Sequence, residues 1–143
     1  MSMSNSAETA FLQLIFNATT WADLAENDTT SPATSLYLSL HTGDPGEAGS
    51  QTTNEATYGS YARVGVVRTA GGWTVASDTV TNAALVQWPA CTSGSNTITY
   101  FGVGTLSAGA GQLLFSGVLT SSIPVATPVQ PQAAIGALSV QIT

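Results

Sequence analysis

The sequence predicts a mainly β fold, a jelly-roll-like sandwich or barrel of about eight strands with one α-helix near the N-terminus. Three observations lead to this prediction. One segment near the N-terminus repeats apolar residues at helical spacing. From residue 33 onward, Val, Ile, Thr, Tyr and Phe dominate, and turn-forming residues interrupt these runs. Strand spacings of about 8 to 12 residues, with the helix outside the pattern, favour these folds over alternating βαβ units.

The helix is expected over Ala7–Ala18, where small and large apolar residues recur every three or four positions. Ser6 is the expected N-cap, and Glu8 lies in the first turn, where the helix dipole favours a negative charge. Residues 17–32 are polar and end at Pro32, so we expect a linker or a short helical turn there. The predicted division is an N-terminal helix and polar linker, residues 1–32, and a β domain, residues 33–143.

The strands are predicted from runs of β-forming residues between turn formers. In the first run, Leu36, Leu38 and Leu40 alternate with more polar residues. The Gly71-Gly72 pair suggests a hairpin turn between the second and third runs. The expected strands cover residues 36–41, 61–69, 73–76, 80–88, 97–103, 112–119, 123–129 and 138–142.

Charge is scarce in this chain of 143 residues, and no charged side chain follows Asp78. Charged residues make up 7% of the chain, against about 25% in an average soluble domain. Much of the surface must therefore consist of Ser, Thr, Asn, Gln and Gly. Hydroxyl groups cost less to remove from water than unpaired charges. This composition favours lasting burial in an assembly.

Several partners and compartments are excluded by composition. The net charge of −6 would be repelled by a phosphate backbone, so we expect no nucleic-acid partner. The longest apolar segment, Phe11–Phe16, is interrupted by Gln13 and is too short to span a membrane. Residues 1–8 lack the basic region of a secretory signal. Cys91 is the only cysteine and is expected to be a small buried apolar residue.

The sequence offers little for catalysis, and we expect neither an enzyme nor a cofactor. His41 is the only histidine and lies near Asp44, an arrangement that a hydrolase could use. No nucleophile motif accompanies it, so His41 is interpreted as a strand-end residue before a turn that Asp44 caps. Gly102 and Gly104 have the wrong spacing for a dinucleotide site, and we expect a bend or a close backbone approach there.

Two groups of residues are candidates for partner contacts. Asp44, Glu47 and Glu55 share residues 42–60, a long loop expected to be exposed and to act as a binding element. Their spacing does not match a calcium loop, so no metal site is predicted. The second group is Phe11, Leu14 and Ile15 on the helix, together with Trp21. This helical face either covers an open end of the β domain or docks on a neighbouring subunit.

Five stretches resemble a group of small tailed-bacteriophage virion proteins, and the resemblance extends over nearly the whole chain. They lie at residues 11–16, 31–49, 61–63, 100–103 and 113–119. Members of this group are often labelled tail fibre proteins, and they are similar to capsid cement or decoration proteins with a jelly-roll-like fold.

The resemblance implies a structural protein of the virion, made in the host bacterial cytoplasm. Shafts of tail fibres use heptads or repeats, and this chain has neither, so capsid decoration is favoured. We then expect a dimer or trimer on the outer capsid surface that binds the major capsid protein and stabilises the assembled shell. The alternative is a tail-fibre or tail-associated receptor-binding module that uses the loop at residues 42–60.

Overall fold

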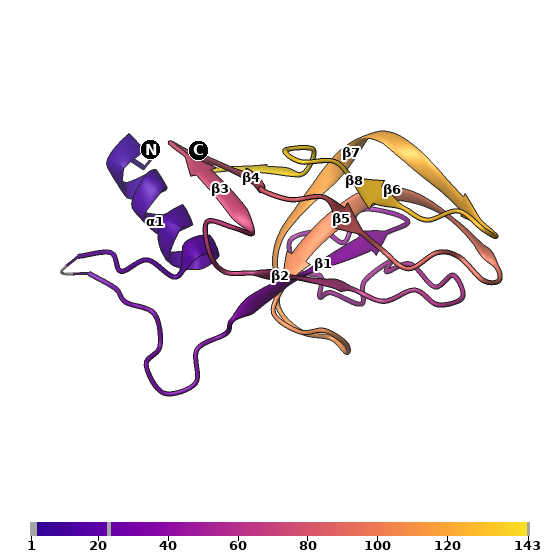
Figure 1. Cartoon of the computed structure of the whole chain (residues 1–143), viewed down its shortest axis with the longest axis horizontal. Helices are drawn as coiled ribbons and strands as arrows, with labels where there is room; N and C mark the ends of the chain where they lie inside the picture. Colours follow the sequence, from indigo (N-terminus) through magenta and orange to yellow (C-terminus); the bar gives the residue numbers. More distant parts are fainter. Residues whose placement is uncertain (1–2, 23, 143) are drawn as a thin grey trace. The chain divides into compact units, whose positions relative to one another are not determined.

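A computed structural model describes residues 3–22 and 24–142. The chain packs as two compact units that are interleaved in sequence. Among the described residues, the first unit contains 3–22, 24–35, 66–85 and 134–142, and the second contains 36–65 and 86–133. The described part holds one helix and nine strands in antiparallel sheets, so the mainly β prediction with a helix near the N-terminus is confirmed (Figure 1). These strands form no closed barrel within the described residues.

The helix α1 (Asn5–Asn17) begins two residues earlier than expected. Its N-cap is Ser4, whose side chain accepts a hydrogen bond from the Ala7 amide at 3.4 Å. The prediction of Ser6 as N-cap is wrong, because Ser6 lies within the first turn and its hydroxyl pairs with that of Ser4 at 3.2 Å. Glu8 does lie in the first turn, as expected. Ala18 ends the helix in the left-handed conformation, with a φ of 53°.

The first unit packs α1 against a three-stranded antiparallel sheet with the order β3 (Trp73–Ala76), β4 (Thr79–Asn82) and β9 (Ser139–Gln141). Figure 1 shows the helix beside β3 and β4. The ring of Phe16 meets that of Trp73 edge to face, with centroids 4.8 Å apart. The buried apolar core of this unit includes Leu12, Phe16, Trp73, Val80, Leu138 and Val140.

The hairpin predicted at Gly71-Gly72 is wrong. Strand β3 pairs with β4, which follows it, and the chain reverses at Ser77 and Asp78, where Ser77 has a φ of 57°. Gly72 instead belongs to a turn in which its amide donates to the Thr69 carbonyl at 2.9 Å. A Cβ on Gly72 would lie 2.2 Å from the Val67 carbonyl oxygen. Gly72 is needed because the backbone of Val67 lies too close for a side chain. A glycine required by a close backbone approach and a glycine required by a hairpin turn look the same in the sequence.

The main sheet of the second unit has the strand order β2 (Val64–Val67), β1 (Ser35–His41), β6 (Ser95–Gly104) and β7 (Leu113–Ala126). Residues 66–67 of β2 and Ser35 of β1 are assigned to the first unit. A short pair, β5 (Val86–Gln87) with β8 (Gln132–Ala133), accompanies the main sheet. Trp88 directly follows β5, and its indole N–H donates to the carbonyl of Leu38 in β1 at 3.2 Å. This hydrogen bond connects the β5–β8 pair to the main sheet. The buried core includes Leu36, Leu38, Leu40, Tyr58, Trp88, Ile98, Phe101, Val103 and Val125. Cys91 is buried as predicted.

Several strand boundaries differ from the prediction. The run at 61–69 contributes only Val64–Val67, and the run at 80–88 is divided into β4 and β5. The runs at 112–119 and 123–129 form one long strand, β7, interrupted by a bulge. The pairing with β6 passes from Ile98↔Ile123 to Tyr100↔Val118, so residues 119–122 bulge opposite Thr99. Strand β8 was not predicted, because two residues are too short for a recognisable pattern.

Candidate partner-binding groove

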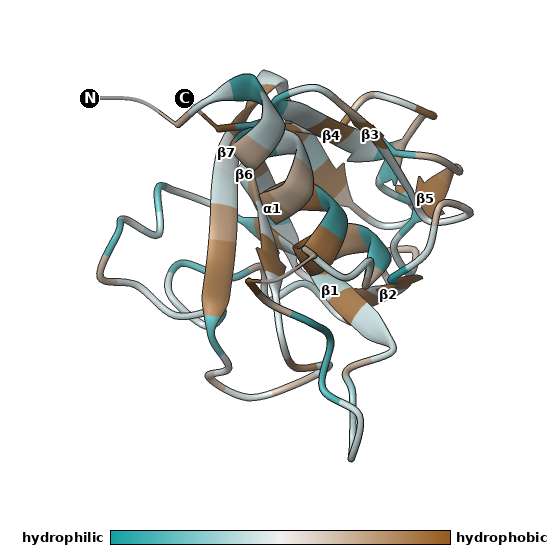
Figure 2. Ribbon diagram, turned by 90° about the vertical axis from the view of Figure 1, so that its left-hand side faces the viewer, coloured by the Kyte–Doolittle hydropathy of each residue, from teal (hydrophilic) through white to brown (hydrophobic). Residues whose placement is uncertain are grey.

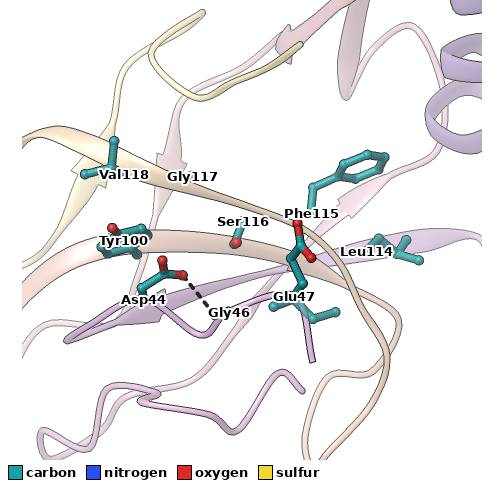
Figure 3. A pocket seen from close by; sticks show the side chains of 10 residues that line it. Asp44, Gly46, Glu47, Tyr100, Leu114, Phe115, Ser116, Gly117 and Val118 are labelled. Carbon is teal, nitrogen blue, oxygen red and sulfur yellow. Dashed lines mark hydrogen bonds between the residues drawn. The ribbon is translucent and has the colours of Figure 1, made fainter. Parts of the chain in front are cut away.

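A groove lies beside strand β7 in the second unit. It has a volume of about 550 Å³, and its lining comes from the turn after β1, from β6 and from β7. Figure 3 shows the Glu47 carboxylate turned toward Phe115 of β7 and the Asp44 carboxylate turned toward Tyr100 of β6. The lining residues are Asp44, Gly46, Glu47, Tyr100 and residues 113–118. The structure thus brings two of the predicted contact residues, Asp44 and Glu47, to one site.

Strand β7 is the edge of its sheet. It pairs with β6 on one side, and no strand in the described part of the chain pairs with its other side. Proteins usually protect such an edge with charges, prolines or bulges. Here Pro124 and the bulge at 119–122 lie in the second half of the strand, and a second irregularity lies at Leu114, where the pairing passes from Val103↔Phe115 to Gly104↔Leu113. Residues 115–118, between the two irregularities, are uncharged and contain neither a proline nor a bulge, and Val118 is 67% exposed. In Figure 2 much of the β7 ribbon has the hydrophobic colour.

Hydrogen bonds hold the turn that carries Asp44 and Glu47. The Asp44 carboxylate accepts a hydrogen bond from the Gly46 amide at 2.8 Å, so Asp44 caps this turn as predicted. The Asp44 carbonyl accepts another from the Asn54 side chain at 2.9 Å. Pro45 is buried, whereas Asp44 and Glu47 are exposed. The two carboxylates therefore stand on a supported backbone at the side of the groove.

The loop at residues 42–60 was expected to be exposed, and most of it is exposed or half-buried, but part of it turns inward. Gln51, Ala56 and Tyr58 are buried. The side-chain amide of Gln51 binds Leu106 twice, accepting from its amide at 2.9 Å and donating to its carbonyl at 3.2 Å. A Cβ on Gly104 would lie 2.2 Å from the Gln51 side chain. The expected close approach at Gly104 thus comes from a side chain rather than from another backbone.

Glu55 is held in a buried network and does not line the groove. Its carboxylate pairs with the Arg63 guanidinium through two hydrogen bonds of 2.6 and 2.8 Å. It also accepts from the Tyr61 hydroxyl at 2.9 Å. Burial raises the pKa of Tyr61. Because Glu55 is turned to these partners, it does not join Asp44 and Glu47, and the described residues contain no cluster of three potential metal-binding side chains.

His41 ends β1 as predicted, and it is fully buried. Its Nδ1 lies 2.8 Å from the Thr53 carbonyl and its Nε2 lies 2.8 Å from the Ser39 hydroxyl. A carbonyl only accepts, so Nδ1 carries a proton. Burial lowers the pKa of His41. Sequence reasoning missed Ser39 as a neighbour of this histidine, but Ser39 is also fully buried and offers a substrate no access.

The remaining predicted contact residues lie in the first unit. Phe11, Leu14 and Ile15 are half-buried, because α1 turns a different face inward, formed by Glu8, Leu12 and Phe16. Trp21 is half-buried and lines a small pocket of about 350 Å³ with Thr20, Leu24, Ala25 and Glu26.

Sequence reasoning missed Tyr100, Ser116 and Val118 as lining residues of the groove. The available signal was the uncharged apolar run at 113–119, which lacks proline and lysine. A sequence pattern does not reveal which strand forms the edge of a sheet.

Comparison with known proteins gives one family. The family described as Podophage GP4 fiber I protein gp80 matches residues 2–141. No curated protein matches the chain. No helix among residues 3–22 and 24–142 has the length and apolar character to cross a membrane.

Proposed function

The chain belongs to the family described as Podophage GP4 fiber I protein gp80, and on this premise we propose that it is a fibre module of a tailed-phage virion. Membership makes it a phage structural protein. The observation that supports the finer assignment is the match itself, which extends over residues 2–141 and is therefore not confined to one motif.

The fibre assignment fits the family description better than capsid decoration does. The predicted outer capsid location, the binding to major capsid protein and the dimer or trimer all stay predictions. The 13 residues of α1, the one helix of the described chain, are too few for a coiled-coil shaft. We therefore propose that this chain supplies a compact attachment or receptor-binding module of the fibre.

We also propose that the module is not catalytic. The one histidine of the chain and its serine neighbour are both fully buried. A general base must come within hydrogen-bond reach of its substrate. The groove beside β7 is lined by two carboxylates, a tyrosine, the hydroxyl of Ser116 and apolar side chains, and it contains no histidine or cysteine that could activate that hydroxyl or act as a nucleophile. These features support binding rather than bond cleavage.

The test is to locate the protein in intact particles. Gold-labelled antibodies raised against the purified chain are applied to purified phage and viewed by electron microscopy. We expect label on the tail or its fibres, and we expect the same antibodies to reduce adsorption to host cells. Label spread over the capsid shell would replace the fibre proposal with capsid decoration. Particles that contain no detectable chain would contradict both. Antibodies pre-absorbed with the purified chain are the control.

A further inference from the structure

We infer that the groove beside β7 binds an extended segment of a different protein, which adds as a strand to residues 113–118 and places a Lys or Arg side chain at Asp44 and Glu47. This inference rests on the proposed function, since it names the kind of partner that the virion module holds. Three features support it: the open sheet edge, the two exposed carboxylates and the use of both arginines inside the chain.

The open edge determines the shape of the ligand. Strand addition uses main-chain hydrogen bonds for affinity and reads alternate side chains for specificity. Residues 115–118, beyond the irregularity at Leu114, provide about 13 Å of regular strand at about 3.3 Å per residue. Val118 and Ser116 are exposed there, so a partner strand meets an uncharged surface that costs little to dehydrate. An extended segment fits this edge better than a helix does.

The carboxylates determine the charge of the ligand. Asp44 and Glu47 line the same groove and are exposed, and neither forms an ion pair in the described part of the chain. An exposed ion pair contributes only about 0–1 kcal/mol. Complementary charge at an interface contributes more to the choice of partner and to the association rate. A basic side chain at this position would therefore select the segment that the edge binds.

The arginines argue against a second copy of the same chain as the occupant. The chain has two arginines and no lysine. Arg63 is committed to Glu55 and to the carbonyls of Leu106 and Gly109. Arg68 donates to the carbonyls of Leu14, Ile15 and Ala33 and to the Asn27 side chain. A second copy would bring a net charge of −6 and no available Lys or Arg to the groove. A different, basic partner satisfies both carboxylates.

The test uses three synthetic nine-residue peptides of alternating Val and Thr. The first carries Arg at two positions, the second carries Glu at the same positions, and the third repeats the first with N-methyl groups on alternate amides. Binding to the full chain is followed by amide NMR titration. We expect the Arg peptide to shift signals of residues 44–47 and 113–118. The Glu peptide should bind about tenfold more weakly, and the N-methyl peptide should not bind, because it cannot complete the strand ladder.

Variants of the chain test the two halves of the site. Val118→Lys changes an exposed side chain and should abolish binding of the Arg peptide, because an edge lysine opposes strand addition. The double variant Asp44→Asn with Glu47→Gln should weaken the Arg peptide about tenfold and bring it close to the Glu peptide. Glu26→Gln, an exposed carboxylate of the other unit, is the matched control and should change nothing. An unchanged amide spectrum away from each substitution shows that the variants fold.

Three results would overturn the inference. One is an Arg peptide that leaves the signals of residues 113–118 unchanged. Another is equal affinity for the Arg and Glu peptides. The third is self-association of the chain, seen by sedimentation, that Val118→Lys abolishes, since the occupant would then be a second copy. Each of these results is independent of where antibodies label the particle, so failure here is distinct from failure of the proposed function.

Discussion

At the residue scale, buried polar side chains hold the structure around the groove. Arg63 and Glu55 have side chains that are only 3% and 14% exposed, and their double hydrogen bond closes a segment of the second unit in which the two residues are eight positions apart. Arg63 also donates to two carbonyls beyond β6, and Tyr61 connects Glu55 to the backbone of β1. Each charge is balanced inside the unit, which is the condition under which a buried ion pair is tolerated.

Removing one member of this pair should be costly. Glu55→Gln leaves the Arg63 guanidinium buried without a counter-charge, and we expect the free energy of unfolding to fall by about 3 kcal/mol. Urea denaturation followed by tryptophan fluorescence measures the change. Glu47→Gln, on an exposed carboxylate, is the matched control and should change stability by less than about 0.5 kcal/mol. Equal effects of the two variants would contradict this account.

The buried histidine should make stability depend on pH. Burial lowers the pKa of His41, so the unfolded chain binds a proton more readily than the folded chain does. Stability is then fully present above the unfolded pKa of about 6.5 and is lost as pH falls below it. Unfolding free energies at pH 7.5 and 5.5 should show this loss, and His41→Asn should remove it. His41 is the only histidine, so a loss that persists in the variant would assign the effect to other groups.

At the element scale, β6, β7 and the segment between them form a frame that holds the loop at 42–60. Gln51 makes this connection. Its side-chain amide hydrogen-bonds both the backbone N–H and the carbonyl of Leu106, and its backbone N–H donates to the Ala110 carbonyl at 2.9 Å. Gly104 and Gly111 provide the space, since a Cβ on either would lie little more than 2 Å from the Gln51 side chain. The turn with Asp44 and Glu47 precedes this anchor in the chain, and Asn54, which follows it, holds the Asp44 carbonyl.

Gly104→Ala tests the frame. The added methyl group must displace the buried Gln51 side chain, and we expect a loss of about 2 kcal/mol in the free energy of unfolding. Gly43→Ala is the matched control, because its Cβ would lie 3.5 Å from the nearest atom, an ordinary contact. In a Gln51→Ala background the clash disappears, so Gly104→Ala should then cost much less. An equal cost in both backgrounds would show that Gln51 is not the cause.

At the scale of the whole molecule, the chain passes repeatedly between two units, and each unit is completed by segments far apart in sequence. The first unit needs α1, the β3–β4 hairpin and β9. Asn82 joins the last two, since its side chain donates to the Ala134 carbonyl and accepts from the Leu138 amide, at 2.8 and 2.9 Å. The predicted division between residues 1–32 and 33–143 stays a prediction, and it can be tested directly.

We expect a fragment of residues 33–143 to be much less stable than the full chain. Without α1, the contacts of Leu12 and Phe16 with the sheet are lost, and burial of two such side chains contributes about 3–6 kcal/mol. Total stabilities are only about 5–15 kcal/mol. Thermal unfolding by circular dichroism measures the effect. A fragment with the same midpoint as the full chain would instead support an independent domain from residue 33 onward.

Much of the fold was predictable because it depends on local periodicity. The alternation of Leu36, Leu38 and Leu40 correctly predicted β1, and helical spacing correctly predicted one helix near the N-terminus. The Gly71-Gly72 hairpin failed because glycine reports only that the backbone is unusual, not which strands pair. The residues of α1 that are most buried, Glu8, Leu12 and Phe16, are not those that the sequence singled out, Phe11, Leu14 and Ile15. The apolar residues of α1 cover a wide part of its circumference, so packing against the sheet decides which of them are buried.

For the site, the sequence alone determined the scarcity of charge, the two acidic residues Asp44 and Glu47 in one turn, and the uncharged run that became β7. These are properties of neighbouring residues. Only the tertiary structure decided that β7 is an edge strand, that Glu55 is committed to Arg63 and that both arginines are used internally. Strand order and ion pairing depend on contacts between residues far apart in the chain, and no local pattern encodes which of those contacts form.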